Sequence, residues 1–91
     1  MGYKGLAEGR PPTKTQSEVL SRMAGGWRLR SMDNGPRESF WLDGPQGETV
    51  WVNGKTHRGL LLRRLVDIDL SDNAITRWML TARGREALKK G

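Results

Sequence analysis

Two turn signals divide the middle of the chain into short segments and strongly limit how it can fold. They are Asp33-Asn34-Gly35-Pro36 and Asp43-Gly44-Pro45-Gln46-Gly47. Gly, Pro, Asn and Asp favour tight turns, since glycine adopts positive φ without a steric penalty and proline fixes φ. Phe40-Trp41-Leu42 lies between the two turns, and short runs of this kind bounded by turn signals are typical of strands. This region therefore predicts a meander of three short strands.

The strands of this meander are rich in aromatic and β-branched residues. The first strand alternates apolar and basic side chains, Trp27, Arg28, Leu29 and Arg30. Because neighbouring side chains in a strand point to opposite faces, the two arginines should share its outer face. The other two strands, 40–42 and 49–52, have compositions that suit a pleated surface.

Helices are expected at both ends of the folded region. Thr15-Gln16-Ser17-Glu18 matches a capping box, in which a hydroxyl and a carboxylate satisfy each other's backbone amides. Gly25-Gly26 would end that helix, because glycine enters the left-handed cap conformation freely. Near the other end of the sequence, Thr81 would cap a last helix over residues 82–90.

A further helix is expected from about residue 54 to residue 66. Its spacing places one set of leucines on a shared apolar face, Leu61, Leu62 and Leu65. The opposite side of this helix carries Thr56, Gly59 and Arg63.

Two more strands, 67–70 and 75–81, should follow this helix. The resulting order is α-β-β-β-α-β-β-α, an α+β fold with three short helices and a small antiparallel sheet. Side chains on the apolar sides of these elements are expected to form one core, namely Trp27, Leu29, Trp51, Leu61, Leu65, Trp78 and Leu80.

The length of 91 residues gives room for one domain with a thin core. Residues 1–13 are rich in Gly and Pro and lack an apolar period, so we expect a disordered basic arm followed by a domain over 14–91. The sequence has no cysteine, no signal-peptide pattern and no apolar run long enough for a membrane helix. We therefore expect a cytoplasmic protein with no membrane partner.

Catalytic and metal-binding patterns are not found. His57 is the single histidine, and with no cysteine the chain cannot assemble a His/Cys metal site. The carboxylates Asp67, Asp69 and Asp72 do not have the spacing of an EF-hand loop. Neither a nucleophile elbow nor a phosphate-binding glycine loop is present. We expect no enzyme activity, no cofactor and no metal, and we expect His57 at the surface or its boundary.

The formal net charge of +6 favours acidic partners, with nucleic acid first among them. Residues 56–66 resemble the recognition helix of winged helix-turn-helix proteins of the MarR-like class. Residues 75–88 are similar to the wing strand and following helix of that class, through an aromatic residue, a Leu80-Thr81 pair and a Gly84-Arg85 pair. The resemblance implies a winged-helix-like domain that binds double-stranded DNA and regulates transcription.

The first half of the chain departs from this pattern. The strands around Trp41 and Trp51 occupy the place of the helix that normally precedes the recognition helix. In this respect the chain resembles small phage- or prophage-type proteins, some of which bind proteins rather than DNA. An alternative function is therefore a protein-interaction module, which would use the tryptophan-bearing meander or a helix face.

The resemblance and the arginine distribution together predict the DNA contacts. The expected nucleic-acid-binding residues are Lys55, Thr56, Gly59, Arg63, Arg77, Arg83 and Arg85. Thr56, Gly59 and Arg63 would face the major groove. Arg77, Arg83 and Arg85 would contact phosphates.

Overall fold

The computed structural model describes residues 10–33, 35, 37–72 and 74–90. The chain is α+β, with the expected order α-β-β-β-α-β-β-α. In chain order the elements are α2 (Lys14–Ala24), β1 (Arg28–Asp33), β2 (Glu38–Asp43), β3 (Thr49–Val52), α3 (Gly54–Leu62), β4 (Val66–Asp72), β5 (Ile75–Leu80) and α4 (Ala82–Lys90). Both the fold class and this order are confirmed.

The predicted arm, 1–13, lies mostly in residues 1–9, which are outside the described residues. Two residues in the rest of that segment contact the domain. Thr13 caps α2, and the Pro11 carbonyl oxygen accepts a hydrogen bond from Arg63 Nε at 3.3 Å.

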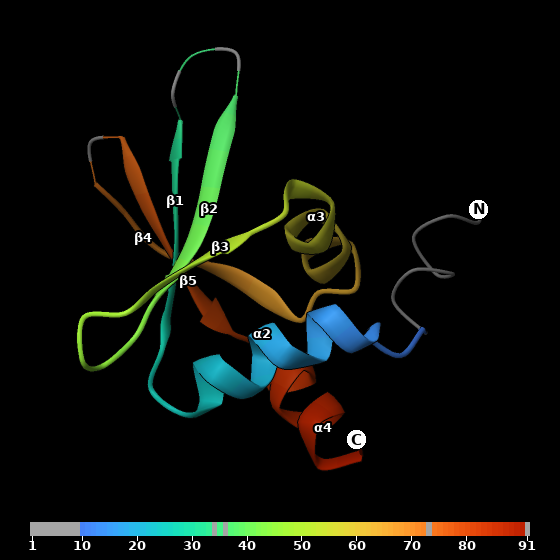
Figure 1. Cartoon of the computed structure of the whole chain (residues 1–91). Helices are drawn as coiled ribbons and strands as arrows, with labels where there is room; N and C mark the ends of the chain where they lie inside the picture. Colours follow the sequence, from blue (N-terminus) through green and yellow to red (C-terminus); the bar gives the residue numbers. More distant parts are fainter. Residues whose placement is uncertain (1–9, 34, 36, 73, 91) are drawn as a thin grey trace, which may run out of the picture.

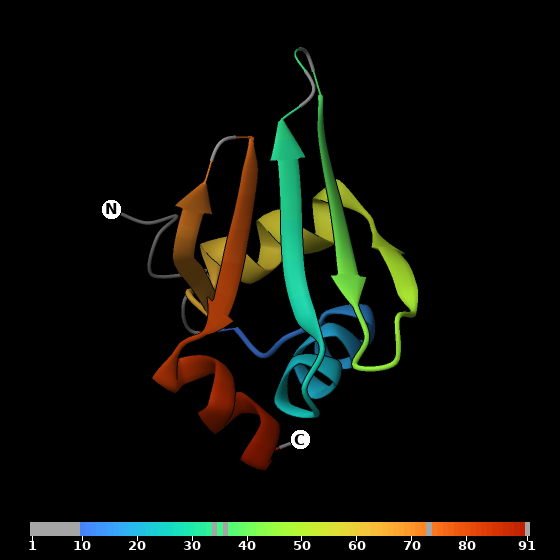
Figure 2. The same cartoon turned by 90° about the vertical axis from the view of Figure 1, so that its left-hand side faces the viewer.

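The strands form one antiparallel sheet in the order β3-β2-β1-β5-β4 (Figure 1). The first strand of the chain, β1, is therefore central and lies between β2 and β5. Figure 2 shows the strands side by side in front of α2 and α3. Both helices lie on one side of the sheet, α4 lies at its end against α2, and no described helix covers the opposite face.

The core lies between the sheet and the helices. Its buried side chains are Val19, Leu20, Leu29, Leu42, Leu60, Leu65, Val66 and Leu80. The expected burial of Leu29, Leu65 and Leu80 is confirmed, and Trp27 and Trp78 are partly buried against this cluster. Trp51 was expected in the core but is 70% exposed. The reason is its position in β3, where its neighbours Val50 and Val52 point toward the core and Trp51 points the other way.

Helix α2 begins two residues earlier than the capping pattern suggested. The Thr13 hydroxyl accepts a hydrogen bond from Gln16 N at 3.2 Å, and Gln16 Oε1 accepts one from Thr13 N at 3.0 Å. The capping box is therefore Thr13 with Gln16, and the prediction that Thr15 caps this helix was wrong. Thr15 lies exposed inside the helix.

Helix α3 ends at Leu62, earlier than expected, because Arg64 adopts a positive φ of 58°. Its buried face carries His57 and Leu60, whereas Leu61 and Leu62 are 38% and 57% exposed. The prediction that Leu61 and Leu62 form the buried face of this helix was therefore wrong. His57 is 3% exposed, so its predicted surface position was also wrong.

Helix α4 is capped as predicted, because Thr81 Oγ1 accepts a hydrogen bond from Gly84 N at 3.0 Å. The same hydroxyl donates to the Arg64 carbonyl oxygen at 2.6 Å. Gly84 is buried against the Leu65 carbonyl oxygen, where a Cβ atom would overlap that oxygen. The start of α4 is therefore held against the segment that follows α3.

Candidate nucleic-acid interface

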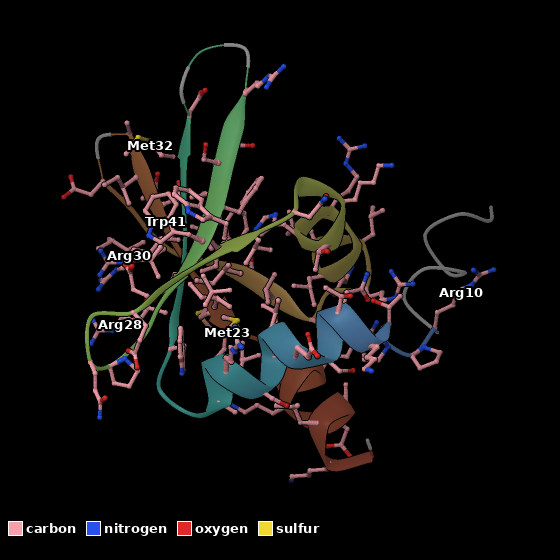
Figure 3. All side chains as sticks on the ribbon, viewed as in Figure 1. Arg10, Met23, Arg28, Arg30, Met32 and Trp41 are labelled. Atoms are coloured by element: carbon pink, nitrogen blue, oxygen red, sulfur yellow. The ribbon has the colours of Figure 1, made fainter. Side chains whose placement is uncertain are left out.

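The sheet surface that faces away from α2 and α3 is called here the open face. Leu29 and Leu42 are buried toward the helices, so the residues that alternate with them must point outward. Figure 3 shows Arg28, Arg30 and Met32 of β1 and Trp41 of β2 projecting on this side. The cross-strand registers extend the open face to Trp51 and Arg77, and alternation along β5 adds Met79. The sequence alternation had predicted the outward position of Arg28 and Arg30, which the structure confirms.

One straight row of side chains crosses all five strands of the open face. Trp51 is opposite Trp41, Trp41 is opposite Arg30, and Arg30 is opposite Arg77. Leu70 of β4 completes the row opposite Arg77. With strands about 4.8 Å apart, the part of the row from Trp51 to Arg77 is roughly 14 Å long. The row is aromatic at one end and cationic in the middle.

The two tryptophans of this row contact each other. Their ring centroids are 5.9 Å apart and the ring planes are tilted by 58°. Trp41 is half-buried, whereas Trp51, on the edge strand β3, is 70% exposed. The Trp51 indole ring is therefore packed against Trp41 but remains accessible to solvent.

The arginines in the centre of the open face have different partners. Arg30 Nε lies 3.2 Å from Asp43 Oδ2, in a pair that is about one-third exposed. Arg28 is directly opposite Asp43 across β1 and β2. Arg77 makes no ion pair with any described residue. Its guanidinium is therefore free to bind an anion.

Carboxylates lie at the other side of the open face, on β4. Asp67 is opposite Met79, and Asp72 is opposite Ile75. Met79 and Leu70 are 42% and 48% exposed. The open face therefore has an aromatic and cationic part that runs from β3 to Arg77 of β5, and an apolar and acidic part formed by Met79 and β4.

A second cationic feature is a groove between β2 and the start of α3. Three basic residues and one carboxylate, Glu38, line it together with aromatic rings; the basic residues are Arg37, Lys55 and Arg58, and the rings are Phe40, His57 and Trp78. The His57 ring stacks on Phe40 at 4.0 Å and meets the Trp78 ring edge-on at 4.4 Å. Burial lowers the pKa of His57 to about 4, so His57 is neutral near pH 7 and adds no charge to the groove.

The predicted site residues fall in separate places. Lys55 lines the groove, with Thr56 half-buried beside it, Arg77 lies on the open face, and Arg83 and Arg85 are exposed on α4. The structure therefore does not bring these seven residues together into one surface.

Two of the residues predicted to contact the DNA major groove face other parts of the protein. Gly59 lies against the Gln16 side chain of α2, so close that a Cβ atom there would overlap Gln16 Nε2. Arg63 donates hydrogen bonds to the carbonyl oxygens of Pro11 and Gly59. The side of α3 that was expected to face solvent is thus partly used for packing.

Four residues of the open face were absent from the predicted site, namely Arg28, Arg30, Trp41 and Trp51. The alternation over residues 27–30 was a sufficient signal for the two arginines. The sequence contained no comparable signal for the tryptophans, because the side of the sheet to which they point depends on the strand register.

Within the described ranges, no helix is long and apolar enough to cross a membrane. The same ranges contain no group of three His, Asp or Glu side chains that could hold a metal ion. Comparison of the chain with protein-family models, with curated proteins and with solved structures found no match.

Proposed function

We propose that this protein binds nucleic acid on the open face of its sheet. The observation that carries the proposal is the group of three arginines, Arg28, Arg30 and Arg77, at the middle of a face that no described helix covers. Guanidinium groups bind phosphate through paired hydrogen bonds. The net charge of +6 adds a long-range attraction for the same class of partner.

The like-charged pair Arg30 and Arg77 supports an anionic partner in particular. Like charges directly opposite each other in a sheet are unfavourable, and Asp43 forms its ion pair with Arg30 and none with Arg77. A phosphate between the two guanidinium groups would relieve their repulsion. The resemblance to winged-helix regulators points toward DNA as the nucleic acid, and it stands here as part of the proposal.

The test is a binding titration of the full chain with labelled oligonucleotides at 50 and 200 mM salt. If about three phosphates are neutralised, affinity should fall roughly 20- to 40-fold between these concentrations. Arg28→Ala and Arg77→Ala should each weaken binding by about tenfold, in the range of a charge-assisted hydrogen bond. Arg85→Ala is the control on α4, and Arg58→Ala tests the groove. Loss of binding in Arg58→Ala alone would move the site from the open face to the groove.

A protein-interaction module is the second candidate function. It is favoured by two groups of exposed apolar side chains on the open face, Leu70 and Met79 near one edge of the sheet and Trp51 at the other. For this function, no oligonucleotide should bind at low salt. Leu70→Ala and Met79→Ala should then weaken association with the partner as much as the arginine variants do.

A further inference from the structure

We infer that the open face binds single-stranded nucleic acid, with an unpaired base stacked on Trp51 and the adjoining phosphates on Arg30 and Arg77. This inference rests on the proposed function and names its ligand class. It follows from the order of side chains in the cross-strand row.

The exposure of Trp51 is the first argument. A tryptophan can bury about 150–250 Å² when it is covered, and at 70% exposed Trp51 leaves most of that area in water. The core does not need this ring, because Val50 and Val52 supply the inward side of β3. Flat rings on sheets and grooves that carry arginines are the usual stacking platforms for unpaired bases.

The geometry of the tryptophan pair is the second argument. Trp41 is tilted by 58° to Trp51, so it braces the second ring without lying parallel over it. An accessible surface of the Trp51 indole stays available for a base. Half-buried Trp41 restricts the motion of the pair, which lowers the entropy lost when a base binds.

The sequence of the row is the third argument. A chain of nucleotides that crosses the strands from β3 to β5 meets Trp51, Trp41, Arg30 and Arg77 in turn. Sheet aromatics of this kind stack about two or three bases. Beyond Arg77 the row reaches Leu70, next to the carboxylates Asp67 and Asp72, which repel phosphate. The row therefore fits a short stretch of a single nucleic-acid strand, which would end beside these carboxylates.

A duplex fits this arrangement less well. Its bases are already stacked and paired, and exposing one to Trp51 would require unstacking at a cost of a few kcal/mol. A second copy of the chain is also a poor occupant. Arg30 and Arg77 lie near the middle of the sheet, so face-to-face pairing centred there would bring the arginines of both copies together.

The experiment compares three probes of the same mixed sequence with the full chain: single-stranded DNA, single-stranded RNA and the DNA duplex. We expect either single strand to bind more tightly than the duplex. Trp51→Leu should weaken single-strand binding by about fivefold to a hundredfold, while Trp51→Tyr retains most of it. Duplex binding should change less than twofold in both variants. Leu70→Ala, at the opposite end of the row, is the matched control and should bind like the parent.

The outcomes separate the two proposals. If no probe binds at low salt, the proposed function itself fails. If single strand and duplex bind equally and Trp51→Leu binds both like the parent, nucleic-acid binding stands and the single-strand inference is overturned. If Trp51→Leu folds poorly, an NMR titration of the unmodified protein tests the inference instead. The Trp51 indole N–H signal must shift when single strand is added, and an unchanged signal at saturation contradicts the inference.

Discussion

Arg30 and Arg77 lie directly opposite each other on β1 and β5, with both side chains on the open face. Such a pair lowers the stability of a sheet unless another charge compensates it. Asp43 compensates Arg30 at 3.2 Å, and Arg77 has no ion-pair partner among the described residues. The arrangement is easier to explain by an anionic ligand than by the stability of the free protein.

Replacing Arg77 should therefore change stability and binding in opposite directions. Arg77→Thr removes the like-charge contact and should raise the free energy of unfolding by about 0.2–1 kcal/mol, while it weakens nucleic-acid binding. Arg28→Thr is the matched control, because Arg28 is opposite Asp43 and its loss should lower stability. Urea unfolding at low and high salt measures the stability of both variants. The difference in free energy of unfolding between them should shrink at high salt, because salt screens the charges. Equal destabilisation by both changes would contradict this account.

The two threonines at the start of α2 should respond differently to the same substitution. Thr13→Ala removes the hydroxyl that accepts a hydrogen bond from Gln16 N and should cost about 1 kcal/mol. Thr15→Ala replaces an exposed helical residue and should stay within about 0.5 kcal/mol of the parent, since alanine has the better helix propensity. Chemical denaturation of both variants provides the comparison. A larger loss of stability in Thr15→Ala than in Thr13→Ala would indicate that Thr15 is the capping residue.

His57 should make the protein less stable in mild acid. Burial holds the pKa of His57 at about 4 in the folded state, against 6.5 for an ordinary histidine. Between these values the unfolded chain takes up a proton that the folded chain does not, so the free energy of unfolding falls as pH decreases. The loss should start near pH 7 and reach on the order of 3 kcal/mol by pH 4.

The control for this prediction is His57→Phe, which keeps a ring against Phe40 and Trp78 but cannot titrate. His57 is the single histidine of the chain, so the difference between parent and variant over pH 5–7 belongs to this group. The pKa can also be read directly by NMR from the imidazole signals of the folded protein. A folded-state value at or above 6.5 would refute the prediction.

Two glycines should give opposite results when changed to alanine. Gly84→Ala places a Cβ atom on the Leu65 carbonyl oxygen, which is already held by Thr81 N at 3.1 Å. Overpacking of this kind costs about 1–3 kcal/mol and outweighs the better helix propensity of alanine. Gly25 has a φ of −87°, and a Cβ atom added there would lie no nearer than 3.4 Å to another atom, so Gly25→Ala should be neutral or stabilise by up to about 1 kcal/mol. Thermal unfolding of the two variants is the measurement.

The element order could be predicted because local signals in the sequence determine it. The two turn signals separate β1, β2 and β3, and Thr81 begins α4 at the residue that the capping preference indicated. The facing of Arg28 and Arg30 could also be predicted, because alternation in a strand depends only on the pleat. These features need no knowledge of tertiary contacts.

The errors concern residues whose surroundings come from distant segments. Trp51 was assigned to the core as part of the apolar side of its strand, but the pairing with β2 places it on the open face. His57 is buried because Phe40 and Trp78 cover it, and both are far from it in sequence. The end of α3 depends on the left-handed conformation of Arg64, which few arginines adopt. The proposed site was missed for the same reason, since the row from Trp51 to Arg77 exists only once three strand registers are known.

The central place of β1 also has a consequence for synthesis. Its neighbours are β2, the next strand along the chain, and β5, the last one. A nascent chain on the ribosome can form the β1–β2–β3 meander early, but one edge of β1 stays unpaired until β5 emerges. Arg77 arrives on that same strand. Prematurely terminated chains are therefore expected to aggregate through the free edge of β1, and they also lack Arg77 of the cross-strand row.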